Sequence, residues 1–492
     1  MVTDSHIEAV RNLAYLLASV LFILGLRGIT HPRTAVRGMQ MGALGMFVAV
    51  LATVIGGGIL DWTWVIAGLL IGSVVGILLA VKIPITDIPQ MVALFNGFGG
   101  AASFLVAGIE LVTRITASNA SSDGVATAGV AVAGPIPLQV LVAIAASGMI
   151  GSLTLFGSMI AAGKLHEVSF SWGGKKIWMS NSLLLPGRHA ITAVSFAACL
   201  VVCALIVMNP QTAAWYWLLV ILAAIFGVLI TIPIGGADMP VVIALLNSYS
   251  GLAASATGFA INNNVLIIAG ALVGASGLIL TKIMCKAMNR SLGIVIFATM
   301  GASRDPGPSE DEVYAGKIKS TSAEEVAMLF DGARRVVIVP GYGMAVSQAQ
   351  HAVRDLANLL ESRGTEVEFA IHPVAGRMPG HMNVLLAEAD IPYGKLKEMD
   401  EINATLETVD VTLVVGANDV VNPVARTDPS SPIAGMPIID VDKCRSVVVV
   451  KRSLSPGFAG IPNPLFAADN TFMFFNDGKK AFLELVAAVK EN

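Results

Sequence analysis

The stretch Arg335-Val-Val-Ile-Val-Pro-Gly-Tyr-Gly-Met-Ala-Val346 decides how the C-terminal part of the chain folds. It begins with a short unbroken apolar run, passes through two closely spaced glycines, and leads into an amphipathic pattern that reaches about Ser362. A short apolar run indicates a buried strand, and the helical periodicity after it indicates a helix. The stretch therefore predicts a strand, a tight turn and a long helix, the repeating unit of a parallel α/β sheet.

The same stretch predicts a phosphate-binding turn of the Rossmann type. Gly341 and Gly343 allow the backbone to approach a pyrophosphate closely, and the N-terminus of a following helix favours negative charge. The fingerprint is imperfect because Val346 stands where its third glycine belongs. Glycine turns of this kind also occur in unrelated proteins, so other strand ends must support a dinucleotide site.

Further strands are predicted at 367–371, 411–415, 446–450 and 471–475, and each is followed by polar or glycine-rich residues. Because ligands of open α/β sheets bind at the carboxyl ends of the strands, we expect these loops to meet at one site. Lys451, Arg452 and Ser453 place two cations and a hydroxyl at one strand end, which suits the 2′-phosphate of NADP. Solvated charges at a strand end are the alternative interpretation.

The first 300 residues have a different character. The chain as a whole is 55% hydrophobic and only 13% charged, whereas about a quarter of the residues of a soluble protein are charged. Most charged residues follow residue 300, so the chain is predicted to combine a membrane domain with a soluble one. Net charge of −3 and scattered basic residues argue against nucleic acid as a partner.

A bilayer is crossed by about 20 apolar residues of helix. Nine segments meet this length: 12–30, 38–60, 62–81, 88–112, 137–163, 190–208, 214–234, 239–261 and 264–285. The run 292–300 is too short and is expected to lead out of the membrane. We therefore predict a multi-pass α-helical membrane domain over 1–300, a linker over 301–322 and a Rossmann-like α/β domain with a parallel sheet over 323–492. A capping box from Thr321 to Glu324 is expected to start its first helix.

The basic residues predict the orientation. If the N-terminus lies outside, eleven basic residues fall on the cytosolic side and two, Arg11 and Arg114, on the other. The eleven are Arg27, Arg33, Arg37, Lys82, Lys164, Lys175, Lys176, Arg188, Lys282, Lys286 and Arg290. The positive-inside rule then places the N-terminus outside and, after an odd number of spans, the soluble domain in the cytosol.

Two of the predicted spans begin alike. Asp87-Ile-Pro and Asn96 recur as Asp238-Met-Pro and Asn247 at a constant offset of 151 residues. An Asn in lipid needs a partner, so both should face the bundle interior or water. A hydrogen bond between helices explains either Asn alone, whereas their repetition favours a polar pathway. The small residues after each Asn are expected to allow close helix packing.

The chain also resembles a known family over nearly its whole length. The segments Gly341–Val346, His372–Glu388, Gly416–Pro423 and Lys451–Ser453 are similar to the NADP(H)-binding domain of proton-translocating NAD(P) transhydrogenase. Gly235–Val241 and Met284–Arg290 resemble the membrane domain of that enzyme. The match is to the beta subunit of bacterial enzymes whose NAD(H)-binding domain lies on a separate alpha chain.

The resemblance implies that NADH on an alpha subunit reduces NADP⁺ on this chain by direct hydride transfer, while a proton crosses the membrane inward. It also implies a bacterial cytoplasmic (inner) membrane and a homodimer of alpha–beta units in the lipid bilayer. A rival interpretation is a transporter or channel whose cytosolic domain senses NADP(H). Composition and the glycine turn fit this rival equally well.

The resemblance also implies roles for residues of the soluble domain. Asp419 is expected near the nicotinamide as the carboxylate that acts in catalysis and coupling, and a loop through Gly457 and Phe458 is expected to fold over the cofactor as a lid. The residues expected to contact NADP(H) are Gly341, Tyr342, Gly343, Val346, Val374, Ala375, Gly376, Arg377, Met378, Pro379, Gly416, Ala417, Asn418, Asp419, Val420, Gly435, Met436, Lys451, Arg452, Ser453, Gly457, Phe458, Asp477 and Gly478. No metal site is expected.

In the membrane domain the resemblance points to Asn96, Asp238, Asn247 and Arg290 for proton movement or coupling. Asp238 and Arg290 stand where the family joins its membrane and soluble domains. Many relatives carry a proton-carrying His at the position of Asn96, which cannot titrate. Either an alpha-subunit residue does this work or Asn96 holds water. Phe458 stands where a Tyr is frequent, which removes a hydroxyl from the lid.

Overall fold

A computed structural model describes residues 2–29, 32–56, 62–84, 87–122, 136–166, 169–172, 175–178, 186–297, 313–314, 316–378, 380–457 and 459–491. Contacts divide the chain into two compact units. The first comprises Met1–Met179, Leu183–Pro233 and Val242–Leu280. The second comprises Ser180–Ser182, Ile234–Val241 and Thr281–Asn492.

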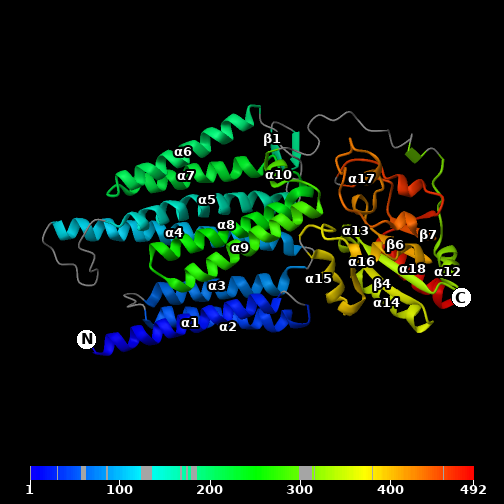
Figure 1. The fold of residues 1–492 in the computed structure, drawn as a ribbon, viewed down its shortest axis with the longest axis horizontal. Helices are drawn as coiled ribbons and strands as arrows, with labels where there is room; N and C mark the ends of the chain where they lie inside the picture. Colours follow the sequence, from blue (N-terminus) through cyan, green and yellow to red (C-terminus); the bar gives the residue numbers. More distant parts are fainter. Residues whose placement is uncertain are drawn as a thin grey trace. The chain divides into compact units, whose positions relative to one another are not determined.

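Nine helices among the described residues are long and apolar enough to cross a membrane, which confirms the predicted multi-pass fold (Figure 1). They are α1 (Val2–Ile29), α2 (Pro32–Gly56), α3 (Trp62–Lys82), α4 (Ile88–Ser122), α5 (Leu138–Leu165), α6 (Arg188–Met208), α7 (Ala213–Thr231), α8 (Met239–Ala260) and α9 (Asn264–Ala287). The short α10 (Leu292–Phe297) follows them. The largest differences at a single end are at α1, which begins at Val2 rather than at residue 12, and at α4, which continues beyond residue 112 to Ser122. Arg114 and Glu110 form an ion pair one turn apart at 2.5 Å there, and such pairs support a helix beyond its apolar run.

Small residues bring these helices together, as expected. Gly100 of α4 lies so close to Gly151 of α5 that a side chain on either would collide with the backbone of the other. Gly251 of α8 meets Gly270 and Gly274 of α9 in the same way. Lipid leaves no hydrophobic driving force between helices, so close backbone approach supplies the packing.

The second unit contains a six-stranded parallel sheet in the order β5-β4-β3-β6-β7-β8. Its strands are β3 (Arg335–Pro340), β4 (Glu366–Ile371), β5 (Leu396–Glu398), β6 (Val411–Val415), β7 (Ser446–Lys451) and β8 (Thr471–Phe475). In chain order this is 3-2-1-4-5-6, the order of dinucleotide-binding sheets, which confirms the Rossmann-like fold. The short edge strand β5 was missed, as was the antiparallel hairpin of β1 (Ser169–Trp172) and β2 (Lys175–Trp178).

Helices and short turns cover the sheet. They are α12 (Ala323–Phe330), α13 (Tyr342–Val346), α14 (Gln350–Ser362), α15 (His381–Glu388), α16 (Met399–Asn403), α17 (Val424–Thr427) and α18 (Gly478–Glu491). The prediction of one long helix after the glycine turn was wrong, because α13 ends and α14 begins separately. Ser347 Oγ donates to the Gly343 carbonyl at 2.8 Å, and Gln348 adopts a positive φ of 50° that breaks the helix.

The second half of the segment predicted as a linker is packed on the sheet instead. Ser320 forms a bridge with Met473 of β8, and the Thr321 amide donates to the Met473 carbonyl at 3.0 Å. The capping box of α12 lies one residue later than predicted, between Ser322 and Glu325. Residues 301–312 of the predicted linker lie outside the described residues.

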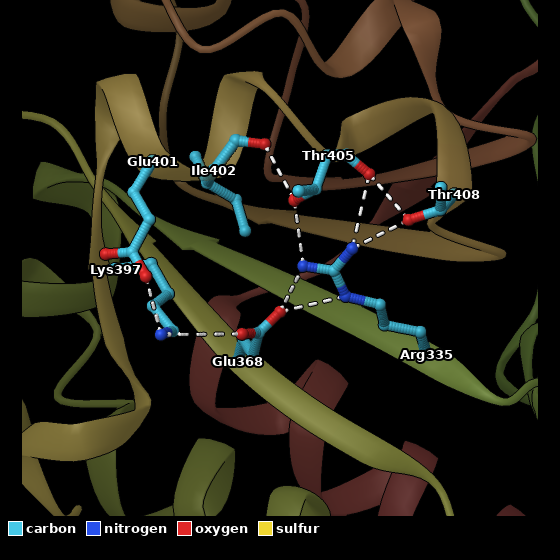
Figure 2. Close-up of polar contacts among 7 residues, drawn as sticks. All are labelled: Arg335, Glu368, Lys397, Glu401, Ile402, Thr405 and Thr408. Carbon is cyan, nitrogen blue, oxygen red and sulfur yellow. Dashed lines mark hydrogen bonds and ion pairs between the residues drawn. The ribbon is translucent and has the colours of Figure 1, made fainter.

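A charged cluster joins the amino ends of the strands (Figure 2). Arg335, the first residue of β3, donates to Glu368 Oε2 of β4 through Nη2 at 2.5 Å and Nε at 2.9 Å. The same guanidinium donates to the hydroxyls of Thr405 and Thr408 at 2.9 and 2.7 Å. Lys397 of β5 lies 4.0 Å from Glu368 Oε1. The cluster thus links three strands at the edge where they begin.

Candidate functional site

A cavity of about 740 Å³ lies at the opposite edge, where β3, β6 and β7 end. Its volume falls within the range of small-molecule and cofactor sites, roughly 300–1,000 Å³. Nineteen predicted residues line it: Gly341, Tyr342, Gly343, Val346, Val374, Ala375, Gly376, Gly416, Ala417, Asn418, Asp419, Val420, Met436, Lys451, Arg452, Ser453, Gly457, Asp477 and Gly478. The strand ends therefore come together as their order in the sheet requires.

Five predicted contact residues are not among the described residues that line the cavity. Pro379 and Phe458 are outside the described residues. Arg377, Met378 and Gly435 fall outside the cavity lining. Ser347, Ser455, Pro456 and Ala459 also line the cavity but were missed, although each lies within two positions of a predicted residue in sequence.

Two turns cross at the centre of the cavity wall. The Gly341 amide donates to the Val415 carbonyl and the Gly343 amide to the Gly416 carbonyl, both at 2.9 Å. A side chain on any of these three glycines would collide with backbone of the opposite turn. Gly416 also has a φ of 62°, which favours glycine. Because α13 has only five residues, we assign no anion-binding role to its N-terminus.

Asp419 contacts the loop that follows β7. We call this loop, residues 453–457 and 459–461, the lid. Asp419 Oδ2 accepts a hydrogen bond from the Ala459 amide at 3.0 Å. Gly457 lies directly against the same carboxylate, and a side chain at this position would overlap it. Asp419 therefore holds the lid against the end of β6.

The three predicted phosphate ligands lie at the start of the lid, which begins with Ser453. Lys451 Nζ donates to the Ser455 carbonyl and lies 5.0 Å from the centroid of the Phe466 ring. Ser453 Oγ lies 2.9 Å from Ser455 Oγ. Arg452 is exposed at the cavity rim. In this arrangement Lys451 contacts the lid as well as the cavity.

Two buried histidines support the loop after β4. His372 Nδ1 accepts a hydrogen bond from the Val374 amide at 3.2 Å, so Nε2 carries the proton that is donated to the Pro437 carbonyl at 2.8 Å. His381 Nδ1 accepts from the Arg377 amide at 3.1 Å. Burial lowers the pKa of both imidazoles to about 4, so both are neutral at pH 7.

Arg377 reaches the site indirectly. Its guanidinium carbon lies 4.4 Å from the centroid of the Tyr342 ring, which lines the cavity. Such a cation–π contact orients the ring. Gly376 beside it has a φ of 112° and faces the ring of His381, where a side chain would not fit. The packing of Gly376 against His381 therefore helps to fix the loop.

The predicted coupling residues of the membrane domain fall into two groups. Arg290 Nη1 lies 2.9 Å from both carboxylate oxygens of Asp238. Burial raises the pKa of Asp238 to about 6, and the positive charge of Arg290 opposes this rise. Asn96 Nδ2 donates to the Ile243 carbonyl of α8 at 3.3 Å, which is the interhelical hydrogen bond named above as one interpretation. Asn247 is half-buried in α8.

Comparisons with known proteins identify the family of the chain. A model of the NAD(P) transhydrogenase beta subunit family matches residues 11–488. The chain belongs to this family. Two curated relatives, both named NAD(P) transhydrogenase subunit beta and both from Rhodospirillum rubrum, are each 46% identical to it over 476 residues. These alignments cover 97% of the chain and 98% of each relative.

As a transhydrogenase beta subunit, the chain is a membrane protein of an NAD(P)-dependent enzyme family. The word beta implies an alpha subunit as its partner. The resemblance found in the sequence is thus confirmed over almost the entire chain.

Proposed function

We propose that the cavity binds NADP(H), and that the chain takes part in direct hydride transfer from NADH on an alpha subunit to NADP⁺, coupled to inward proton movement. The crossing of the Gly341–Gly343 turn with Gly416, at the switch point of a 3-2-1-4-5-6 sheet, is the observation that carries the proposal.

The residues of the cavity fit a dinucleotide phosphate. Backbone atoms of the opposite turn occupy the positions that side chains at Gly341, Gly343 and Gly416 would need. Main-chain groups therefore form this part of the cavity wall. Such a wall can approach a pyrophosphate closely. Arg452 and Lys451 supply two cations for a 2′-phosphate, a group that NAD(H) lacks. When bound, the nicotinamide would supply the site that accepts or donates hydride.

The chain's own residues would close this site. Ala459 and Gly457 of the lid line the cavity and contact the Asp419 carboxylate. A closed lid excludes water from a hydride acceptor and delays cofactor release. We infer that Asp419 controls lid opening, because its carboxylate is the acceptor for the Ala459 amide. Loss of its negative charge would weaken this hydrogen bond.

A proton gradient can drive the reaction only if NADP(H) affinity differs between two states of the membrane domain. We assign the change of state to Asp238 and Arg290. Burial brings the pKa of Asp238 to about 6, so its charge can change near physiological pH. Protonation removes the negative charge to which Arg290 is bonded, and we propose that this change favours lid opening.

The proposed setting is a bacterial cytoplasmic membrane with the N-terminus outside and the NADP(H) domain, residues 323–492, in the cytosol. The bias of eleven basic residues against two supports this orientation. Two alpha–beta units would form the complete enzyme.

Isotope transfer in the complete complex tests the proposal. The chain is reconstituted with its alpha subunit in lipid vesicles, and NADH that carries deuterium at C4 of the nicotinamide is supplied with NADP⁺. Direct transfer should place the deuterium in NADPH, with proton movement across the vesicle membrane. NADP(H) binding without deuterium transfer would contradict the enzyme and favour a sensor that regulates transport.

A further inference from the structure

We propose that Tyr314 is a positioning residue that links the segment arriving from the membrane domain to the lid and to the Asp419 loop, and thereby sets the rate of NADP(H) release. This inference rests on the proposed function of the cavity. It adds a residue that no sequence motif of the cofactor site contains.

Tyr314 lies at the start of the described part of the soluble domain. Val313 and Tyr314 are the first described residues after Phe297, which ends α10. The Tyr314 side chain is 6% exposed and belongs to the main core of the second unit. Its ring stacks on Phe466, with centroids 6.4 Å apart and planes inclined by 20°. A segment so close to the membrane domain in sequence is therefore anchored deep in the α/β core.

The hydroxyl of Tyr314 reaches the C-terminal end of the lid. It accepts a hydrogen bond from the Asn463 amide at 3.0 Å. Asn463 is fully buried, and a buried backbone N–H without an acceptor costs about 1–3 kcal/mol. The hydroxyl therefore fixes the backbone two residues beyond the lid.

Asn463 continues the connection to the loop that carries Asp419. Its Nδ2 donates to the Asn418 carbonyl at 3.1 Å, and its Oδ1 accepts from the Leu465 amide at 3.0 Å. Asn418 directly precedes Asp419, whose carboxylate accepts from the Ala459 amide of the lid. Tyr314, Asn463 and Asp419 thus hold the lid at its far end and at its contact with β6.

Hydrogen bonds hold residues 317–321, so we infer that a displacement arriving along the chain would act at Tyr314. The Lys317 amide donates to the Tyr314 carbonyl at 2.8 Å. The Met473 amide of β8 donates to the Lys319 carbonyl at 2.7 Å. The first bond closes a local turn, and the second, with the bond from the Thr321 amide to the Met473 carbonyl, holds residues 319–321 against β8. A movement transmitted along the chain therefore reaches the Tyr314–Asn463 hydrogen bond before it reaches the sheet.

Removal of one oxygen atom tests this role. Tyr314→Phe keeps the stacked ring and deletes the acceptor of the Asn463 amide. In the reconstituted alpha–beta complex we expect NADPH release to accelerate roughly fivefold. The release rate is measured by rapid mixing of the NADPH-loaded complex with excess NADP⁺, which displaces the NADPH. The KM for NADP⁺ should rise, and acceleration of turnover by an imposed proton gradient should weaken. Tyr393→Phe, in which the ring is 43% exposed, is the matched control and should leave all three unchanged.

Asn463→Asp provides a second break in the same connection. It keeps the oxygen that caps Leu465 and replaces the amide that donates to Asn418, so it should reproduce the faster release. It also carries the test if Tyr314→Phe yields no folded protein. The inference would be overturned if both variants released NADPH and responded to a proton gradient as the wild type does, whether or not their melting temperatures were lower. Failure of the wild-type complex to bind NADP(H) would instead overturn the proposed function of the cavity.

Discussion

Arg290 and Asp238 close the two ends of a helical hairpin. Asp238 directly precedes α8 and Arg290 follows α9, and Arg290 Nη1 lies 2.9 Å from both oxygens of the carboxylate. The Asp238 side chain is 1% exposed and the Arg290 side chain 11%, so water screens the interaction little. A change in the charge of one residue therefore changes how firmly the hairpin is closed.

The first prediction concerns pH. Burial raises the pKa of Asp238 from 3.8 to about 6, so the neutral carboxyl stabilises the fold below pH 4, and this stability is lost as pH rises through about 6. Protonation also removes the charge that Arg290 contacts, so NADPH release from the complex should change with an apparent pKa near 6 and be fastest on the acid side. Asp238→Asn should abolish this change of release rate with pH when release is measured from about pH 4.5 to about pH 8.

Asp87→Asn is the matched control for this prediction, because Asp87 is the equivalent acid of the sequence repeat. It should retain the pH dependence of the wild type. A pH profile in Asp238→Asn that matches the wild type would exclude Asp238 as the titrating group.

The second prediction concerns cofactor selectivity. Arg452 follows β7 at the cavity rim, and Arg452→Gln should weaken NADP⁺ binding roughly ten- to a hundredfold, the size of a hydrogen bond between charged groups. Binding of NAD⁺, which has no 2′-phosphate, should not change. Titration calorimetry with both nucleotides measures the difference.

Arg445→Gln controls for the loss of a positive charge at the opposite end of the same strand. Arg445 directly precedes β7 and its side chain is 81% exposed. It should bind NADP⁺ as the wild type does. An equal loss of affinity for both nucleotides in Arg452→Gln would contradict a role in phosphate recognition.

The third prediction concerns the crossing of the two turns. In Gly416→Ala the new methyl group meets the backbone of Gly343, and the φ of 62° adds strain. The turns must separate, so NADP(H) affinity should fall by roughly tenfold or more and the melting temperature should drop. Gly394→Ala, which meets open space, should change neither property. Normal NADP(H) binding by Gly416→Ala would show that the crossing is not needed.

The fourth prediction separates stability from binding. Glu368→Gln leaves Arg335 without its ionic partner, and their side chains are 12% and 17% exposed. We expect a loss of about 2 kcal/mol, between the values for exposed and buried pairs. Chemical denaturation should show this loss, while NADP(H) affinity stays unchanged. Glu407→Gln, at an exposed position, is the control and should have no effect on either.

Local sequence patterns predicted most elements of the fold. The apolar runs at 411–415 and 471–475 coincide with β6 and β8, and the strand order then brings the predicted strand ends to one cavity. These features depend on neighbouring residues and on general rules for parallel sheets. The strand β5, of three residues, is too short to form a recognisable pattern.

Contacts between distant residues could not be predicted in this way. The hydrogen bond from the Asn463 amide to the Tyr314 hydroxyl joins residues 149 positions apart. Tyr314 stood in a segment rich in charge and glycine that resembled a linker, and only the packed core shows its ring against Phe466. The separation of α13 from α14 likewise depends on a positive φ at Gln348, a residue with no special preference for it.

The parallel sheet has a practical consequence for protein engineering. β3 begins in the charged cluster at Arg335 and ends at Pro340, immediately before the glycine turn of the cavity. Well-packed apolar residues often replace a buried ion cluster without loss of stability. Robustness could therefore be designed into the starting edge of the sheet while nucleotide preference is redesigned at the finishing edge, so that two libraries can be screened separately and then combined.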